Sequence, residues 1–382
     1  MTRYFAWAIC MTFVLILVQF SSNADAEPIE IGYTETIAST ALGRDMTIMV
    51  HLPDGYSEGD QSYPVIYALE GQWYFSYLVS LFDRTVPNEH IPPAIIVGLE
   101  MSNPSRFGIL RPGGEESALF RQFLGAELIT HINTHYRTTD HRLLLGWEFG
   151  GAFTLETLAL QPDLFSGYVA SSPYPIGSVS DEISARGLTA DFAHKRFLYV
   201  GVSQSEGVVN QGIALLEDML STPEQKWSAR VFAGDRFDVQ HLTSAYPVFR
   251  AGINRYFDDF PHLRPENAAE LRAMGGVTYA KDYYARRGAK YGTTPELDFI
   301  SSWWLFRVSI ESQDFQLFEE LAAEVDIAAD AAFGPYRFLQ YAQFYNENGH
   351  PDRGLALLEA AHDHFPDNQA ISDALTAART GK

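Results

Sequence analysis

Hydrophobic and polar residues alternate in two different ways along this chain, and the pattern changes near residue 257. From about residue 45 to residue 257, short and nearly all-apolar runs are separated by segments with helical periodicity. Apolar runs of this length are typical of parallel strands buried on both faces, and the alternation with amphipathic helices indicates a sheet that helices cover on both sides. The pattern therefore predicts an α/β domain with a mostly parallel sheet.

The expected elements can be placed by their residue numbers. The strands are expected at 47–52, 64–69, 94–99, 142–146, 167–171, 197–202 and 229–232. The helices between them are expected at 117–136, 151–160, 208–220 and 243–257.

The remainder of the chain predicts a separate helical domain. Pro261 and Pro265 interrupt a linker, and the sequence beyond them is rich in Ala, Leu, Glu and aromatic residues without strand-like runs. Residues 301–325 have the pattern of one helical hairpin and residues 335–368 that of a second. Because a single hairpin cannot bury its own apolar face, we expect these helices to pack on one another or on the α/β domain.

The second hairpin resembles one tetratricopeptide repeat. Gly354 stands where that repeat usually has its small residue at the start of the second helix, and glycine weakens a helix. The resemblance implies that the C-terminal helices are a site for a protein partner. It depends on the small and aromatic positions Phe338, Ala342, Tyr345, Ala361 and Pro366.

The first 26 residues have the features of a secretory signal peptide. An apolar run from Trp7 to Phe20 follows Arg3, and a polar segment then ends in an Ala-x-Ala pattern at Ala26. The run is shorter than the roughly 18 to 20 residues that span a membrane, which disfavours an uncleaved anchor. The predicted divisions are a leader at 1–26, an α/β domain at 27–260 and a helical domain at 261–382.

Composition restricts the location and the partners. The chain carries 27 basic and 48 acidic side chains, a net charge of −21, and nucleic acids and anionic membranes are poor partners for such a protein. Its single cysteine, Cys10, lies in the leader, so the mature chain has no disulfide and no thiol nucleophile. Export without disulfides predicts a bacterial periplasmic or secreted protein.

The segment from Arg142 to Gly151 has the form of a nucleophile elbow. It reads Arg-Leu-Leu-Leu-Gly-Trp-Glu-Phe-Gly-Gly, a strand that leads directly into a helix. The strained turn of an elbow needs small residues two positions before and two after its centre, and Gly146 and Gly150 meet that need. At the centre, where the usual motif has serine, this chain has Glu148.

Several segments around the elbow follow one another in the order of a known family. They are Tyr63-Pro-Val-Ile-Tyr-Ala-Leu-Glu70-Gly71, Pro92-Pro-Ala-Ile-Ile-Val-Gly98, Phe123-Leu-Gly-Ala-Glu-Leu, Tyr136-Arg-Thr, Pro162-Asp-Leu-Phe and Ser172-Pro173. With them the chain resembles the Putative esterase family of α/β-hydrolases, to which siderophore esterases belong. The resemblance covers about residues 30 to 257 and implies the α/β-hydrolase fold, the hydrolysis of carboxylic esters and a small-molecule ester or related ligand as partner.

This chain departs from the family at two places. Relatives usually read Leu-Asp-Gly where Glu70 stands, and usually carry an Arg-x-x-Asp stretch near Arg106, where this chain has Phe107, Gly108 and Ile109.

The family's order of nucleophile, acid and histidine assigns candidate catalytic residues. Glu148, Glu206 and His241 occur in that order, with His241 as general base and Glu206 as the carboxylate that orients it. Asp235 and Asp238 are rivals of Glu206 for this role.

The family also implies an oxyanion hole made of backbone N–H groups. These would belong to Phe149, after the elbow, and to Gln72 or Trp73, after the first core strand.

Glutamate at the elbow leaves two interpretations open. Its attack on an ester would give a mixed anhydride, so acyl transfer by the usual serine path is not expected. In an active enzyme, Glu148 is either a direct nucleophile or a carboxylate that helps to activate water. In an inactive one, Glu148 accepts the hydrogen bonds of the oxyanion hole at the helix N-terminus, and the pocket only binds a ligand. Glu148 could instead pair with His241, which favours the imidazolium form and makes the base less available.

Other candidate groups have simpler explanations. His131 and His135 lie four residues apart on an expected helix, but Ile132 occupies the place of a zinc-protease glutamate, so a solvated helix face is favoured over a metal site. His362 and His364 are expected to decorate a helix end. No cofactor motif occurs in the sequence.

Further serines and aromatic residues are expected in structural roles. The residues concerned are Ser172, Ser203 and Ser205, expected in core or loop hydrogen bonds, and Trp303, Trp304, Phe306, Phe338, Tyr341 and Tyr345, expected in the helical core rather than in a ligand groove.

Overall fold

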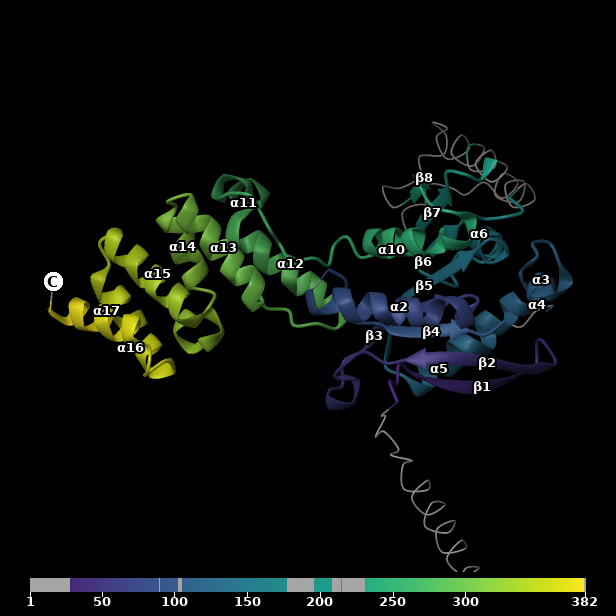
Figure 1. The fold of residues 1–382 in the computed structure, drawn as a ribbon, viewed down its shortest axis with the longest axis horizontal. Helices are drawn as coiled ribbons and strands as arrows, with labels where there is room; N and C mark the ends of the chain where they lie inside the picture. The colour runs from purple at the N-terminus through teal and green to yellow at the C-terminus, as the bar shows by residue number, and fades with distance from the viewer. Residues whose placement is uncertain are drawn as a thin grey trace, which may run out of the picture.

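The computed structural model describes residues 28–88, 90–101, 105–176, 196–207, 214 and 231–380. They form an α/β domain followed by a helical domain, which lie side by side in an elongated molecule (Figure 1). The expected leader at 1–26 and the expected helix at 208–220 lie outside the described residues, apart from residue 214.

The α/β domain is built on one eight-stranded sheet of order β1-β2-β4-β3-β5-β6-β7-β8. β1, β2 and β4 pair antiparallel, and the remaining neighbours pair parallel. Strands β3, β4, β6 and β7 are buried throughout, as their apolar runs predict, and β5 is buried over its second half, from Leu143 to Trp147. The strands are β1 (Tyr33–Ser39), β2 (Arg44–His51), β3 (Tyr63–Ala68), β4 (Ile95–Leu99), β5 (Thr138–Trp147), β6 (Gly167–Ser171), β7 (Phe197–Ser203) and β8 (Val231–Phe237).

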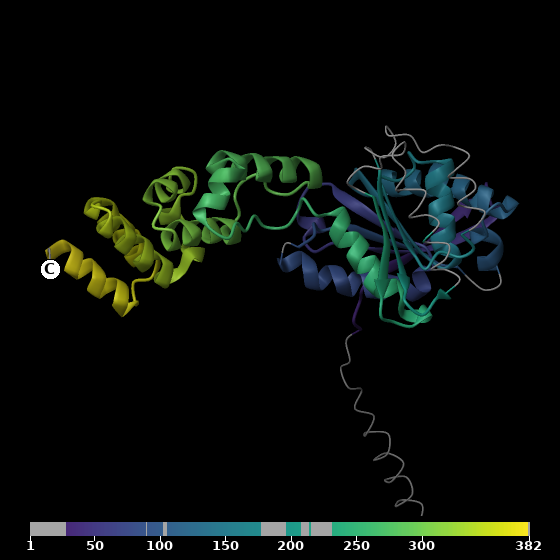
Figure 2. The same cartoon turned by 90° about the horizontal axis from the view of Figure 1, so that it is seen from above.

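Helices cover both faces of this sheet (Figure 2). One apolar core lies between the sheet and α2 with α10, and a second lies between the opposite face and the helices from α3 to α6. The segment from Glu115 to His135 is one continuous helix with a π-helical stretch at Phe123–Leu128. The helices are α2 (Gly71–Thr85), α3 (Ser105–Leu110), α4 (Glu115–Gln122), α5 (Ile129–His135), α6 (Phe149–Leu160) and α10 (Ala245–Tyr256).

Several elements differ from the sequence-based prediction. Strand β1 was not expected; it pairs with β2 at the antiparallel edge of the sheet, and its residues alternate in exposure instead of forming an apolar run. Helices α2, which begins at Gly71 soon after β3, and α3 lie where no helix was expected. The last strand was expected at 229–232 but β8 extends to Phe237.

The helical domain has a third apolar core of its own, which runs from Leu263 to Leu375. Both expected hairpins are present: α13 pairs with α14, and α15 pairs with α16. Its helices are α11 (Ala268–Met274), α12 (Gly276–Tyr291), α13 (Phe299–Glu311), α14 (Phe315–Ala322), α15 (Gly334–Glu347), α16 (Pro351–His364) and α17 (Gln369–Thr380).

Gly354 explains the close packing of the second hairpin. A Cβ atom at this position would lie 2.8 Å from the carbonyl oxygen of Ala342 on α15. The glycine that weakens α16 as an isolated helix is therefore what allows α16 to approach α15.

Candidate active site

The elbow expected from the sequence is present at the carboxyl end of β5. Glu148 joins β5 to α6 with φ 51° and ψ −113°, a strained conformation that non-glycine residues rarely adopt. A Cβ atom on Gly146 would lie 2.2 Å from the carbonyl oxygen of Gly150, so this position accepts only glycine. A Cβ atom on Gly150 would meet its nearest neighbour, Glu70 Oε2, at 3.4 Å, which is an ordinary contact.

Glu148 points its side chain toward two basic groups. Its Oε2 accepts a hydrogen bond of 2.7 Å from Nη2 of Arg106, and its Oε1 lies 3.8 Å from Nε2 of His241. The carboxylate makes no capping hydrogen bond to α6. The expected hydrogen bonds from the first turn of α6 to Glu148 are therefore not made; the carboxylate pairs with Arg106 and lies within ion-pair distance of His241.

Glu206 is the carboxylate that holds His241. Its Oε1 pairs with Nδ1 of His241, and its Oε2 accepts a 3.3 Å hydrogen bond from the backbone N–H of Ser203. The rival carboxylates lie elsewhere: Asp235 accepts a hydrogen bond from the hydroxyl of Tyr199, and Asp238 is exposed.

Trp147 supports the same histidine from the strand side. Its indole ring centroid lies 4.8 Å from the imidazole, and its Nε1 donates to the carbonyl oxygen of His241 at 3.2 Å and to Ser244 Oγ at 3.1 Å. The histidine backbone and ring are thereby fixed beside the elbow, with Nε2 facing Glu148.

The expected oxyanion donors lie at the first turns of two helices. Phe149 is the first residue of α6, and Gln72 and Trp73 follow Gly71 at the start of α2, where N–H groups have no acceptor within the helix. The Trp73 N–H, however, donates to the carbonyl oxygen of Glu70 at 2.9 Å. Of the alternatives Gln72 and Trp73, this leaves the Gln72 N–H as the candidate partner of Phe149.

Arg106 joins two carboxylates and was not recognised from the sequence as a site residue. Its Nε pairs with Glu70 Oε1 and its Nη2 pairs with Glu148, while the residue itself is buried. The signal that pointed to it was the departure of both Glu70 and the Arg106 stretch from the family pattern. The two positions at which the sequence departs from the family pattern are thus in direct contact in the structure, through the ion pair of Arg106 and Glu70.

Burial sets the charge on Glu70. Burial raises the pKa of the Glu70 carboxyl to about 7, against the lowering effect of Arg106, and the charge of Glu148 raises it further. Burial also opposes the charge on Arg106, but the two glutamates outweigh it and raise the pKa of the guanidinium. Arg106 is therefore charged throughout the physiological range, while Glu70 titrates near neutrality.

The serines considered as substitutes have structural roles. Ser172 Oγ lies 2.9 Å from Ser244 Oγ, and Ser203 Oγ contacts Ser205 Oγ at 2.7 Å and also donates to the carbonyl of Val239. These are the core and loop hydrogen bonds expected for them.

The histidine pairs also have structural contacts. His131 Nε2 lies 2.7 Å from Glu35 Oε2, and His364 Nε2 lies 2.8 Å from the carbonyl oxygen of Ala328. Within the described residues, no group of three or more His, Cys, Asp or Glu side chains is arranged to hold a metal ion.

The helical domain contains a buried Ser, His and Asp that do not form a catalytic triad. His262 Nδ1 lies 3.0 Å from Ser301 Oγ and 3.3 Å from Asp298 Oδ2, so serine and aspartate approach the same ring nitrogen. A triad needs them on opposite nitrogens. The aromatic residues Phe338, Tyr341 and Tyr345 are likewise buried in the helical core, as expected.

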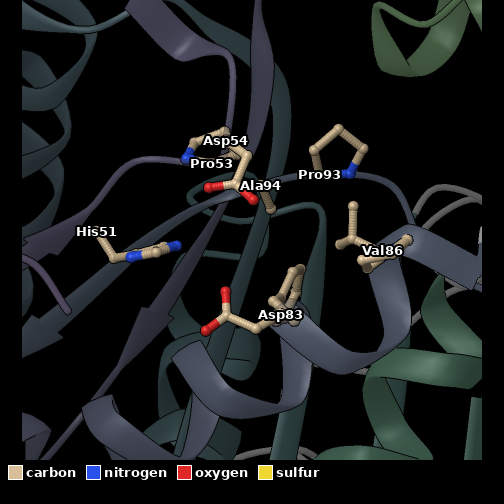
Figure 3. A pocket seen from close by; sticks show the side chains of 9 residues that line it. His51, Pro53, Asp54, Asp83, Val86, Pro93 and Ala94 are labelled. Atoms are coloured by element: carbon tan, nitrogen blue, oxygen red, sulfur yellow. The ribbon is translucent and has the colours of Figure 1, made fainter. Parts of the chain in front are cut away.

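A small cavity lies beside the start of β4, and Figure 3 shows the side chains that line it. It measures about 60 Å³, and His51, Asp54 and Asp83 line it together with prolines and Phe82. Ala94 on its wall directly precedes β4, which places the cavity at the amino ends of the parallel strands. It therefore has no part in the elbow site.

None of the helices in the described ranges is long and apolar enough to cross a membrane.

The sequence comparisons identify relatives of the α/β domain. Residues 39–227 match the family model described as Putative esterase. Two Bacillus subtilis proteins are each 28% identical: Uncharacterized protein YjcH over 142 residues and Ferri-bacillibactin esterase BesA over 137 residues. These matches span 36% and 29% of this chain, and 59% and 47% of the relatives' own lengths.

Solved structures share the fold at low sequence identity. An uncharacterised protein from Capnocytophaga ochracea has a TM-score of 0.63 at 19% identity, over 91% of this chain and 99% of that one. An IroE-like serine hydrolase from Shewanella oneidensis has a TM-score of 0.57 at 20% identity, over 76% and 98%. The comparisons confirm the resemblance found in the sequence and the α/β-hydrolase fold with a C-terminal helical region.

Proposed function

Because this chain carries a domain of the Putative esterase family, we propose that it hydrolyses carboxylic esters with a water molecule that His241 activates, in place of a serine nucleophile. The observation that carries the proposal is the pair of His241 and Glu206, with Nε2 of the imidazole facing Glu148. This pair orients a general base beside the elbow, where the activation of water needs one.

The spacing at the elbow suits a water between base and carboxylate. The 3.8 Å between His241 Nε2 and Glu148 Oε1 exceeds a direct hydrogen bond, and a water beside them can donate one O–H to each. Neutral His241 takes one proton at Nε2 as the water oxygen attacks the ester carbonyl, and Glu206 stabilises the imidazolium. His241 then returns the proton to the departing alkoxide, which gives the acid and the alcohol.

Arg106 limits the electrostatic cost of a carboxylate at this place. An uncompensated Glu148 would repel the negative charge that develops on the carbonyl oxygen. The ion pair with Arg106 neutralises much of that charge, while the N–H groups of Phe149 and Gln72 provide the oxyanion donors. Direct attack by Glu148 is the less favourable route, because its product is an anhydride and Arg106 restrains the carboxylate.

A second candidate function is ligand binding without turnover. The same Glu148–Arg106 ion pair supports it, since a fixed carboxylate at the elbow removes the usual nucleophile and reduces the space beside the hole. The C-terminal helices are then the proposed site for a protein partner. In either case we propose export to the periplasm or medium after cleavage behind Ala26, in keeping with the predicted leader.

The test is hydrolysis of 4-nitrophenyl acetate by residues 27–382, compared with the variants His241→Ala and Glu148→Ser. We expect the natural chain to exceed His241→Ala by about 100-fold or more, the contribution of a general base. His135→Ala, an exposed histidine on α5, serves as the matched control and should keep the full rate. A natural chain no faster than His241→Ala, together with a gain in Glu148→Ser, would reject hydrolysis and leave the binding function.

A further inference from the structure

Exposed aromatic side chains surround the elbow. Trp73, Phe107 and Tyr174 are 42%, 47% and 44% exposed, unusually high for large apolar side chains. Phe149 connects two of them, with ring centroids 5.3 Å from Phe107 and 6.1 Å from Tyr174. We call these four residues the aromatic rim. Grouped exposed aromatic residues in a soluble protein mark a binding surface.

Three carboxyl groups and two basic groups are linked beside the aromatic rim, and burial raises the pKa of one of these carboxyls, Glu70, to about 7. Glu70, Glu148 and Glu206 are connected there with the single guanidinium of Arg106 and the imidazole of His241. Arg106 is only 3% exposed and already pairs with two carboxylates. Glu148, in contrast, is 23% exposed and directs only one of its two oxygens to Arg106. Among the groups bound to Arg106, Glu148 is therefore the one that a ligand can reach, and it lies beside the 38% exposed imidazole of His241.

The aromatic rim already binds one cation from its inner side. The Arg106 guanidinium lies 5.2 Å from the ring centroid of Trp73, 5.0 Å from that of Phe107 and 5.9 Å from that of Phe149. Trp73 and Phe107 nevertheless remain 42% and 47% exposed. Rings and carboxylate together form the combination that recognises organic cations in proteins.

We propose that the aromatic rim and Glu148 select substrates that carry an organic ammonium group near the ester. The ammonium lies against Trp73 and Phe149, with Glu148 Oε1 as its counter-ion. Anionic esters are disfavoured at the same site, because the charge they would need is buried and already paired. This inference rests on the proposed function for the ester, but the cation preference itself does not depend on turnover.

The test uses three phenols that differ in the charge of one substituent. They are 3-(trimethylammonio)phenol, its neutral isostere 3-tert-butylphenol, and the anion 3-hydroxybenzoate, with binding to residues 27–382 measured by calorimetry. We expect the cation to bind at least about 10-fold more tightly than the neutral isostere and the anion to bind most weakly, with a preference that decreases as salt increases. Equal affinity for cation and isostere, or tighter binding of the anion, overturns the proposal.

Variants then assign the preference to the named residues. Glu148→Gln, which removes the charge but keeps the shape, should reduce the cation preference about 10-fold, and Trp73→Leu should weaken binding of the cation more than that of the isostere. Glu347→Gln on α15 removes an exposed glutamate far along the chain and should change nothing. If the preference for the cation is unchanged in Glu148→Gln, another group binds the ammonium, and the proposed site is rejected.

Turnover of the acetate esters of the cation and the isostere separates the two proposals. Selective binding without hydrolysis keeps the cation site and rejects the esterase function. If the two esters are hydrolysed at equal rates and the two phenols bind with equal affinity, the esterase function is kept and the cation site is rejected.

Discussion

At the scale of single residues, the site depends on two glutamates whose backbone has a positive φ, a conformation that residues other than glycine seldom adopt. Glu70 has φ 59° and Glu148 has φ 51°, and the two lie at the starts of α2 and α6. Arg106 binds both, so one buried guanidinium connects the loop that supplies an oxyanion donor with the elbow itself. The serine of the usual motif needs no such partner, because a hydroxyl carries no charge to neutralise.

Substitution of Glu70 by glutamine should change how stability depends on pH. With a pKa of about 7 in the folded protein against an ordinary value of 4.5, Glu70 binds a proton on folding between those two values. Its contribution to stability is therefore present at low pH and decreases as the pH rises through this window. Glu70→Gln should be more favourable relative to the natural chain at pH 8 than at pH 5, by roughly 2 to 3 kcal/mol.

Urea unfolding at pH 5 and pH 8 measures this difference. Glu58→Gln, at an exposed glutamate, is the control and should show the same small effect at both values of pH. The same difference at both pH values for Glu70→Gln would show that Glu70 is ionised throughout and that Arg106, rather than burial, sets its charge.

At the scale of elements, the site residues lie where strands end and helices begin. β5 ends at Trp147, α6 starts at Phe149, and the turn between them presents Glu148, while the turn after β3 presents Glu70. His241 and Glu206 come from the ends of β8 and β7. Because the carboxyl ends of parallel strands lie at one edge of a sheet, residues that are up to 171 positions apart meet there.

The two glycines of the elbow should differ sharply in their tolerance of a methyl group. Gly146→Ala would place Cβ 2.2 Å from a backbone oxygen that cannot move without deforming the elbow, so a loss of about 3 kcal/mol or more is expected. Gly150→Ala places Cβ at 3.4 Å or more from every neighbour and gains helix propensity, so its stability should stay within about 1 kcal/mol. Thermal unfolding of the two variants, side by side, measures the contrast. Equal losses would mean that the elbow does not have this geometry.

At the scale of the whole molecule, the helical domain is attached through the core of the α/β domain. Tyr291, the last residue of α12, is buried against Phe257 and Phe260, with ring centroids 5.5 and 5.4 Å apart, and its hydroxyl donates to Asp259. It belongs to the apolar core beneath α2 and α10 rather than to the helical core. The second domain therefore contributes a side chain to the first.

Removal of the Tyr291 ring should uncouple the two domains. Tyr291→Ala leaves a cavity in the α/β core, with an expected loss of about 3 to 5 kcal/mol, and should split one urea transition into two. Tyr291→Phe keeps the ring, loses the hydrogen bond to Asp259, and should cost about 1 kcal/mol with a single transition. Intrinsic fluorescence and far-ultraviolet circular dichroism follow the unfolding. A single transition in Tyr291→Ala would indicate that other contacts couple the domains.

The sequence by itself determined what depends on local pattern. Buried strands are continuous apolar runs, and β3 to β7 follow from that, as do the two helical hairpins from their 3.6-residue periodicity. The elbow followed from two glycines at fixed spacing, and the order of Glu148, Glu206 and His241 followed from the family resemblance. Edge strand β1 and helix α2 were missed, since an edge strand needs no apolar run and α2 begins without a side-chain cap.

Only the tertiary structure decided which groups meet. The choice of Glu206 over Asp235 and Asp238, the engagement of the Trp73 N–H and the joining of Glu70, Arg106 and Glu148 all depend on side-chain direction and on distances between different strand ends. Sequence spacing carries no such information, because the sheet order 4-3-5-6-7-8 brings together residues whose separation along the chain is arbitrary. The charge of Glu70 was also decided only by the tertiary structure. Burial raises the pKa of its carboxyl, and burial depends on the fold and not on the residue type.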